Sequence, residues 1–237
     1  MQSFFRFPST PHLAWLSRLA VPREDKVLCR EDAASLLSGE VVVEEKLDGA
    51  NIGLSLAEDG SLQVQNRGQY LIAPFVGQFV NVPEWLSQHG EDIRDRLDGS
   101  LIIFGEWCAA RHSISYDRLP DWFVMFDVYD RAIARFWSTD RRNALASAAN
   151  LVTVPTLLRG KTNLAQLEEI MDKRLSRYAL EPMEGLVVRR ESALWCERRA
   201  KLVRPDFTQE ITEHWSRHSI KWNRVDWSVR SDPNSAT

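Results

Sequence analysis

Short apolar runs separated by turn residues recur along much of the chain. Runs of this length, rich in valine, isoleucine and aromatic residues, predict β-strands. The expected strands lie at 41–46, 52–56, 62–66, 101–108, 122–129, 185–190 and 193–203. Asp-Gly pairs at 59–60 and 98–99 supply turn chemistry beside these runs.

Apolar residues also recur at helical spacing, which predicts four helices, at 83–97, 139–149, 163–175 and 211–222. Pro83 suits the first turn of the first helix. Ser138 or Thr139 can cap the second, and Asn163 begins a capping-box pattern before the third. Consecutive strands with helices placed irregularly among them favour the α+β class with antiparallel sheets over a doubly wound fold.

The 237 residues contain no internal repeat or flexible linker, so we expect one continuous domain over 1–237 with a frayed polar tail at 231–237. A formal net charge of −3 and 44% hydrophobic residues exclude the collagen-like, disordered and membrane classes. The cysteines, Cys29, Cys108 and Cys196, have no CxxC spacing. They indicate neither a disulfide framework nor a zinc site, and they favour a reducing, cytoplasmic location.

The segment VVVEEKLDGANIGL places Lys46 at the end of a valine-rich strand, with Asp48 and Gly49 in the following turn. A partly desolvated lysine near other cations or a metal can have a lowered pKa and act as a nucleophile. Taken alone, however, the lysine of such a segment is more often a structural residue on the protein surface than a nucleophile.

Further polar segments follow downstream, each with a charged or polar residue inside an apolar strand. Burying an unpaired charge is expensive, so several such charges that converge indicate a charged ligand. The segments are QNRGQY with Arg67, LIIFGEWCAARHSISY with Glu106, FVMFDVYD with Phe126 and Asp127, EPMEGLVVRR with Glu184, and RRAKLVRPDF with Lys201.

This order of motifs over about 40–207 resembles the ATP-dependent RNA ligases of the phage T4 RNA ligase 2 type, in the covalent lysine nucleotidyltransferase superfamily. The KxDGxN pattern ends at Asn51, where DNA ligases and capping enzymes usually carry arginine. The resemblance implies an ATP-grasp-like nucleotidyltransferase domain of antiparallel sheets flanked by helices. It also implies ATP and Mg²⁺ as cofactors, with Mn²⁺ as a substitute.

The implied reaction has three steps at phosphorus. Lys46 attacks the α-phosphate of ATP to form lysyl-AMP, AMP passes to an RNA 5′-phosphate, and a 3′-hydroxyl displaces AMP to join the strands, a chemistry suited to RNA repair. Two alternatives remain open: a DNA ligase or capping-type guanylyltransferase, and a catalytic subunit or binding module that needs a partner protein for sealing.

The resemblance also implies roles for the polar residues at phosphate and metal. Lys201 holds the α-phosphate, and Arg67 contacts phosphate. Glu184 places a divalent metal, and Glu106 contacts the metal or the nucleoside sugar. Asn51 reaches the phosphates of the later steps.

The base is expected to stack on Phe126, although a core phenylalanine fits the strand pattern nearly as well. Asp127 is expected to orient Arg67, and Glu45 to help read adenine. His112 is interpreted as an orienting or substrate contact, because no second histidine lies at a spacing suited to a metal.

Two features depart from the family pattern. The second lysine of the last motif is replaced by Val203, so either Arg204 or Arg199 is expected to supply the second basic group, or the first step relies on metal alone. Only 30 residues follow Phe207, so we expect a catalytic domain without a separate C-terminal clamp domain, and a partner protein can supply that clamp or heal the ends.

The C-terminal end of the chain is basic and rich in tryptophan. Residues 1–188 carry 20 basic and 26 acidic side chains, whereas 189–237 carry 10 and 7. Such a surface can bind single strands, but a helix docked on the domain with an exposed basic face is the favoured interpretation. The residues are Trp215, Trp222 and Trp227, with Arg217, Lys221, Arg224 and Arg230 between and after them.

Overall fold

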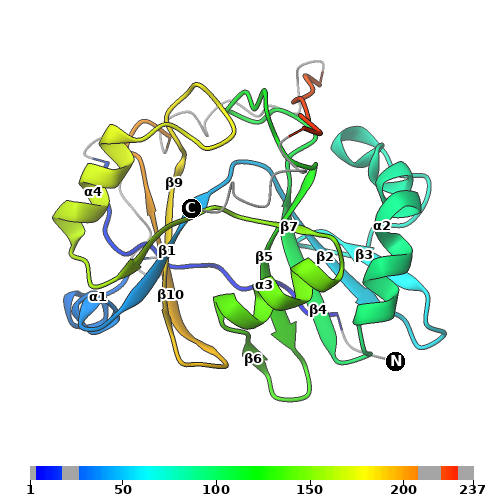
Figure 1. The fold of residues 1–237 in the computed structure, drawn as a ribbon, viewed down its shortest axis with the longest axis horizontal. Coiled ribbons are helices and arrows are strands. Elements are labelled where there is room, and N and C mark those ends of the chain that lie inside the picture. Colours follow the sequence, from blue (N-terminus) through cyan, green and yellow to red (C-terminus); the bar gives the residue numbers. More distant parts are fainter. Residues whose placement is uncertain (1–3, 18–26, 208–219, 229–237) are drawn as a thin grey trace.

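The computed structural model describes residues 4–17, 27–207 and 220–228. Within them, the chain forms two β-sheets that lie side by side and are covered by helices (Figure 1). Nearly all strand pairs are antiparallel, and the helices are interspersed irregularly, so the predicted α+β class is confirmed. The tail at 231–237 lies outside the described residues.

The first sheet has four antiparallel strands in the order β10–β9–β1–β8. They are β1 (Val41–Lys46), β8 (Thr156–Gly160), β9 (Gly185–Glu191) and β10 (Cys196–Val203). Apolar side chains of these strands pack against helices α1 (Arg30–Leu37) and α4 (Leu164–Lys173) in one core. Strand β1 is central and buried along nearly its whole length, so its polar residues are held firmly.

The second sheet has the order β3–β2–β4–β5–β6, and β7 pairs with β5 in parallel. Its core packs against α2 (Val82–Arg96) and α3 (Thr139–Ala148). A single 3-10 turn, η2 (Gly77–Phe79), precedes α2. The strands are β2 (Ala50–Leu56), β3 (Leu62–Gln65), β4 (Leu101–Trp107), β5 (Phe123–Asp130), β6 (Arg135–Phe136) and β7 (Val152–Thr153).

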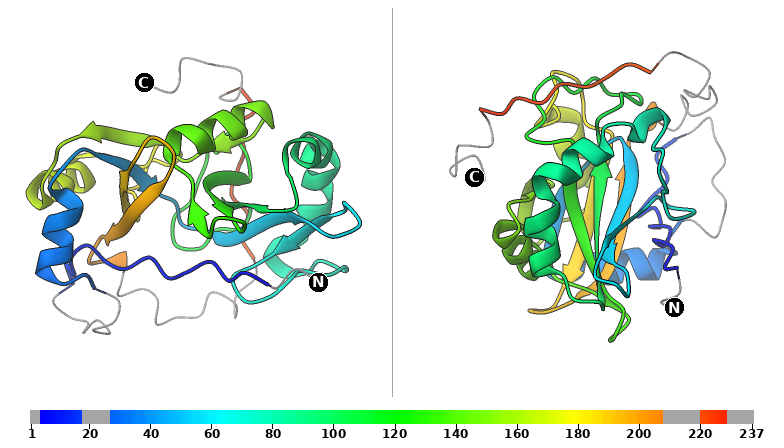
Figure 2. Two further views of the ribbon diagram at one scale, coloured as in Figure 1. Left: turned by 90° about the horizontal axis from the view of Figure 1, so that it is seen from below. Right: turned by 90° about the vertical axis from the view of Figure 1, so that its right-hand side faces the viewer.

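The N-terminal segment, residues 4–13, runs from the second sheet to the first (Figure 2). At one end, the Gln65 side chain donates a hydrogen bond to the Phe5 carbonyl at 2.8 Å. At the other end, the Leu13 N–H donates to the Lys201 carbonyl at 2.7 Å. A piece of chain that belongs to neither sheet therefore ties the two together.

All the predicted strands are present, the one at 41–46 with the predicted bounds and the others with shifted ends. The strand expected from 193 begins at Cys196, because the Ser192 N–H donates to the Trp195 carbonyl at 2.9 Å and closes a turn. Helix α1 and strands β6, β7 and β8 were not predicted. They are short, and β6 and β7 have only two residues each.

Three predicted helices are confirmed, and the Ser138 and Asn163 side chains cap α3 and α4. The predicted helix at 211–222 lies mostly outside the described residues. Its described end is not helical, because Trp222 is extended and pairs with Ala110 in a β-bridge. In the described ranges, none of the helices has the length and apolar character needed to cross a bilayer.

Candidate active site

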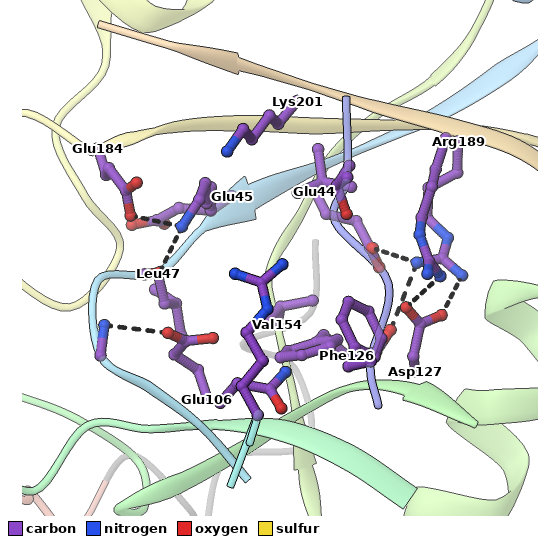
Figure 3. Close-up of a pocket in the computed structure, with 18 residues that line it drawn as sticks. Glu44, Glu45, Leu47, Glu106, Phe126, Asp127, Val154, Glu184, Arg189 and Lys201 are labelled. Atoms are coloured by element: carbon purple, nitrogen blue, oxygen red, sulfur yellow. Dashed lines mark hydrogen bonds and ion pairs between the residues drawn. The ribbon is translucent and has the colours of Figure 1, made fainter. Parts of the chain in front are cut away.

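A cavity of about 420 Å³ lies between the two sheets (Figure 3). Strands of both sheets and the N-terminal segment contribute to its wall. Nine of the ten predicted site residues line it: Glu45, Lys46, Asn51, Arg67, Glu106, Phe126, Asp127, Glu184 and Lys201. The fold therefore brings together polar residues that are distant in sequence. The tenth predicted site residue, Arg204, does not line the cavity.

Lys46 ends β1 and pairs in register with Gly185 of β9. This register brings Lys46 Nζ to 2.7 Å from Oε2 of the preceding residue, Glu184. Burial would lower the pKa of Lys46, but the charges of nearby carboxylates, chiefly Glu184, outweigh burial and raise it. The expectation of a lowered lysine pKa is thus wrong for the ligand-free protein, in which Lys46 is an ammonium.

Glu106 lies in β4 opposite Asn51 of β2, and its Oε1 accepts a hydrogen bond from the Gly49 N–H at 3.1 Å. Burial raises the pKa of Glu106 to about 7, although the Lys46 charge opposes the shift. Burial also raises the pKa of Glu184. The carboxylates in this corner of the cavity could therefore carry more negative charge than the single positive charge of Lys46 can neutralise.

Glu106 and Glu184 are the candidate ligands for a cation. In the part of the chain that the structure describes, no group of three or more His, Cys, Asp or Glu side chains could hold a metal ion. Magnesium is commonly held by one or two carboxylates together with water and phosphate oxygens. The two glutamates fit such an open site, in which a bound nucleotide would supply further ligands.

The turn after Lys46 is fixed by its neighbours. The Asp48 carboxylate accepts hydrogen bonds from the N–H groups of 113–114, at 2.7 and 3.0 Å. The Asp48 N–H donates to Tyr116 Oη at 2.8 Å. At Gly49, an added Cβ would lie 2.6 Å from a carbonyl oxygen of β4. The spacing of the KxDG motif therefore serves to position the lysine.

His112 lies beside the same turn. Its Nδ1 is 4.0 Å from the Asp48 carboxylate, and its Nε2 is 2.8 Å from Gln78 Oε1. Burial lowers the pKa of His112, so the imidazole is neutral at pH 7. These contacts are compatible with an orienting role.

Asp127 and Arg67 both line the cavity, but Asp127 does not orient Arg67 as expected. The Asp127 carboxylate accepts hydrogen bonds from Arg189 and Arg199, both at 2.6 Å. Arg67 instead donates to Ser9 Oγ at 3.1 Å. The reason is strand register, because Arg189 and Arg199 are directly paired on β9 and β10 and both reach the same carboxylate.

A buried ionic network backs the cavity, and sequence reasoning missed it. Arg142 of α3 bonds Glu44 of β1 at 2.6 Å. Arg189 bonds Asp127 and Glu191, and it lies 3.8 Å from Glu44. Since buried charges are tolerated only when paired, this network fixes α3, β1, β5 and β9 relative to one another. Glu44 in a valine run and Arg189 in an apolar strand were the available signals.

Residues 39–203 match the sequence model of the RNA ligase family. The chain belongs to the RNA ligase family. A comparison with curated proteins found no match.

Solved structures of a Naegleria gruberi RNA ligase share the fold of this RNA ligase family member. A single-residue mutant of that ligase with ATP and Mn has a TM-score of 0.66 and 18% identity, over 90% of this chain and 60% of the other. A second mutant, with AMP and Mn, has a TM-score of 0.63 and 17% identity, over 89% and 59%. The chain thus spans about 60% of the length of these solved structures.

Of the two arginines considered for the second basic group of this RNA ligase family member, Arg199 lines the cavity and Arg204 does not. The Arg199 guanidinium lies over the Phe7 ring, 4.7 Å from its centroid. Arg204 instead pairs with Asp206 at 3.2 Å and donates to the Met171 carbonyl at 3.3 Å.

The aromatic part of the cavity centres on Phe126 of β5 (Figure 3). Phe7 packs edge-on against it, with ring centroids 5.4 Å apart. Phe7 and Thr10 also line the cavity. Sequence reasoning missed both, because the N-terminal segment has neither strand nor helix periodicity.

Two buried acceptor atoms at the cavity, Glu45 Oε1 and Asn51 Oδ1, have no hydrogen-bond partner in the described structure. The other Glu45 oxygen accepts the Arg177 N–H at 2.9 Å. Burial raises the pKa of Glu45. Because buried polar atoms are rarely left unsatisfied, these two positions are suited to donors of a ligand.

Proposed function

We propose that this protein is an ATP-dependent RNA ligase that joins 3′-hydroxyl and 5′-phosphate ends through lysyl-AMP and RNA-adenylate intermediates. The observation that carries the proposal is the position of Lys46, which opens on the cavity with Glu184 at 2.7 Å, while Lys201 and Arg67 line the same space. A nucleophile that shares a cavity with phosphate-binding cations is what phosphoryl-transfer chemistry requires. Its natural role would be RNA repair in the cytoplasm.

In the first step, the Lys46 nitrogen forms a bond to the α-phosphorus of ATP, and the bond to the bridging oxygen breaks. Pyrophosphate leaves with that electron pair, and before attack the ammonium must give up a proton, for which the Glu184 carboxylate at 2.7 Å is the nearest acceptor. Glu184 and Glu106 hold this proton on Lys46 in the ligand-free site. Magnesium, or manganese in its place, would be held by these two glutamates and would supply positive charge against the phosphates.

The remaining wall suits the rest of the nucleotide. Lys201 extends toward Glu184 and would hold the α-phosphate, whereas Arg67 would hold other phosphate oxygens (Figure 3). Phe126 offers a ring on which adenine can stack. Asn51 lines the same cavity and would contact the substrate in the later steps.

Labelling with ATP that carries a radioactive α-phosphate tests the nucleophile. Wild type and Lys161→Ala, an exposed lysine outside the cavity lining, should form a labelled protein adduct with magnesium. Lys46→Ala should form none. An adduct that persists in Lys46→Ala would overturn the assignment, and preferential labelling by GTP would favour a capping-type enzyme.

A sealing assay tests the substrate. A 5′-phosphorylated strand is offered single-stranded, in nicked duplex RNA and in nicked duplex DNA. Joining of RNA ends is expected, and joining of DNA alone would make the protein a DNA ligase. Adduct formation with sealing only after a partner protein is added would make it a catalytic subunit.

A further inference from the structure

Residues 220–228, here called the C-terminal strap, run along the loop at 108–119, and the right-hand view of Figure 2 shows them extended. The Arg111 N–H donates to the Lys221 carbonyl at 2.8 Å. Further along, the Leu119 N–H donates to the Arg224 carbonyl at 3.0 Å. The strap is therefore hydrogen-bonded to the loop near both ends of the loop.

One buried side chain anchors the strap. Asn223 is only 7% exposed, and its Oδ1 accepts the Tyr116 N–H at 2.9 Å. Its Nδ2 donates to the carbonyls of Cys108 and Ala110, at 2.8 and 3.2 Å. Because the anchor is an inward-facing amide, the outward side chains of the strap are free for another role.

The outward face is aromatic and basic. Trp222 and Trp227 are 46% and 51% exposed, and Lys221 and Arg224 are exposed beside them. No ion pair joins either basic residue to another residue that the structure describes. The acidic residue of the strap, Asp226, is used locally, because it accepts hydrogen bonds from Ser228. This face is thus locally positive on a chain of net charge −3.

The strap lies close to the nucleophile. The loop that it covers bonds Asp48 through the N–H groups of 113–114, and Asp48 is two residues from Lys46. Residue and strand spacings place Lys46 and Lys221 within roughly 25 Å of each other along this path. A stacked strand covers that distance in about seven nucleotides at 3.4 Å each.

We propose that the C-terminal strap binds the single-stranded RNA that leads away from the active site. The two indoles stack on bases, and Lys221 and Arg224 contact phosphates, which is how single strands are held without sequence preference. The positive charges of Lys221 and Arg224 beside the two exposed indoles favour a polyanion with stacking bases as the ligand of this face. The inference rests on the proposed ligase function, but binding can be measured without catalysis.

The test measures the affinity for a fluorescent, 5′-phosphorylated single-stranded RNA of about 15 nucleotides, a length that spans the path above, without ATP. Trp222→Ala with Trp227→Ala should weaken binding about ten-fold or more, since each stacked base contributes several-fold. Lys221→Ala with Arg224→Ala should weaken binding. It should also make the slope of log K against log salt concentration less steep by about 1.4, which corresponds to the loss of two phosphate contacts on a single strand. Leu194→Ala and Lys161→Ala, an exposed apolar residue and an exposed lysine outside the strap, are the matched controls.

Every outcome separates the two proposals. All strap variants should still form the labelled AMP adduct, because that step needs no RNA. RNA affinity equal to that of the controls would overturn the strap proposal, whatever the adduct assay gives. The strap proposal also fails if the variants keep RNA affinity but lose binding of a second protein. If wild type binds RNA through the strap but forms no adduct, the ligase proposal alone fails.

Discussion

Replacing Glu106 by glutamine should change how the stability of the ligand-free protein depends on pH. Burial, opposed by the Lys46 charge and reinforced by the charges of Glu184 and Asp48, raises the pKa of Glu106 from its ordinary 4.5 to about 7. Between these values the folded protein keeps a proton that the unfolded chain has released. The contribution of Glu106 is therefore fully present below pH 4.5 and is lost as the pH rises through 7.

The size of this effect follows from the shift. A rise from 4.5 to about 7 is worth on the order of 3 kcal/mol in the free energy of unfolding. Glutamine cannot titrate, yet its amide oxygen can still accept the Gly49 N–H that Glu106 accepts at 3.1 Å. The variant should match wild type near pH 5 and be the more stable protein at pH 8, where wild type must bury the charge of Glu106 beside those of Glu184 and Asp48.

Urea unfolding at pH 5 and pH 8 with a chelator present measures the difference. Glu197→Gln removes an exposed carboxylate whose pKa is lowered by hydrogen bonds, so its profile should parallel wild type over this range. Parallel profiles for wild type and Glu106→Gln would refute the reasoning.

Three further changes test other parts of the structure. Asp127→Asn should cost about 3–5 kcal/mol in urea unfolding, because it leaves Arg189 with less opposite charge inside the protein, whereas Glu197→Gln should cost at most about 1 kcal/mol. Gly49→Ala should slow adduct formation about ten-fold or more, measured as the initial rate of AMP incorporation, because its Cβ would meet a carbonyl oxygen at 2.6 Å and shift the nucleophile. Asn223→Ala should lower the free energy of unfolding by about 2–4 kcal/mol, because its side chain makes three hydrogen bonds in a buried position, and an unchanged urea midpoint would contradict the anchor.

The strands could be predicted because each carries its own apolar pattern. Strand β8, TLLRG, escaped because it is an edge strand with exposed and half-buried positions, so the pattern of burial is weak. Helix α1, REDAASLL, buries only Leu36 and has little apolar periodicity. Local sequence therefore specified the elements that bury a full face and missed those that lie at the margins.

The composition of the site was predictable for a related reason. A charge inside an apolar strand requires a partner, so Lys46, Glu106 and Glu184 stood out in the sequence. Which charges pair, however, depends on register between strands that are far apart in the chain. The Lys46–Glu184 contact, 138 residues apart in sequence, reverses the expected direction of the lysine pKa. The pairing of Asp127 with the arginines of the first sheet has the same origin.

The N-terminal segment shows what neither pattern nor motif could reveal. Backbone hydrogen bonds hold Lys201 on both sides, from its N–H to the Pro11 carbonyl at 2.9 Å and from the Leu13 N–H to its carbonyl at 2.7 Å. Between these bonds and the Gln65 contact, the segment places Phe7 and Thr10 in the cavity wall. The cavity is therefore walled by both sheets and by the N-terminal segment, and that segment also fixes the strand that carries Lys201.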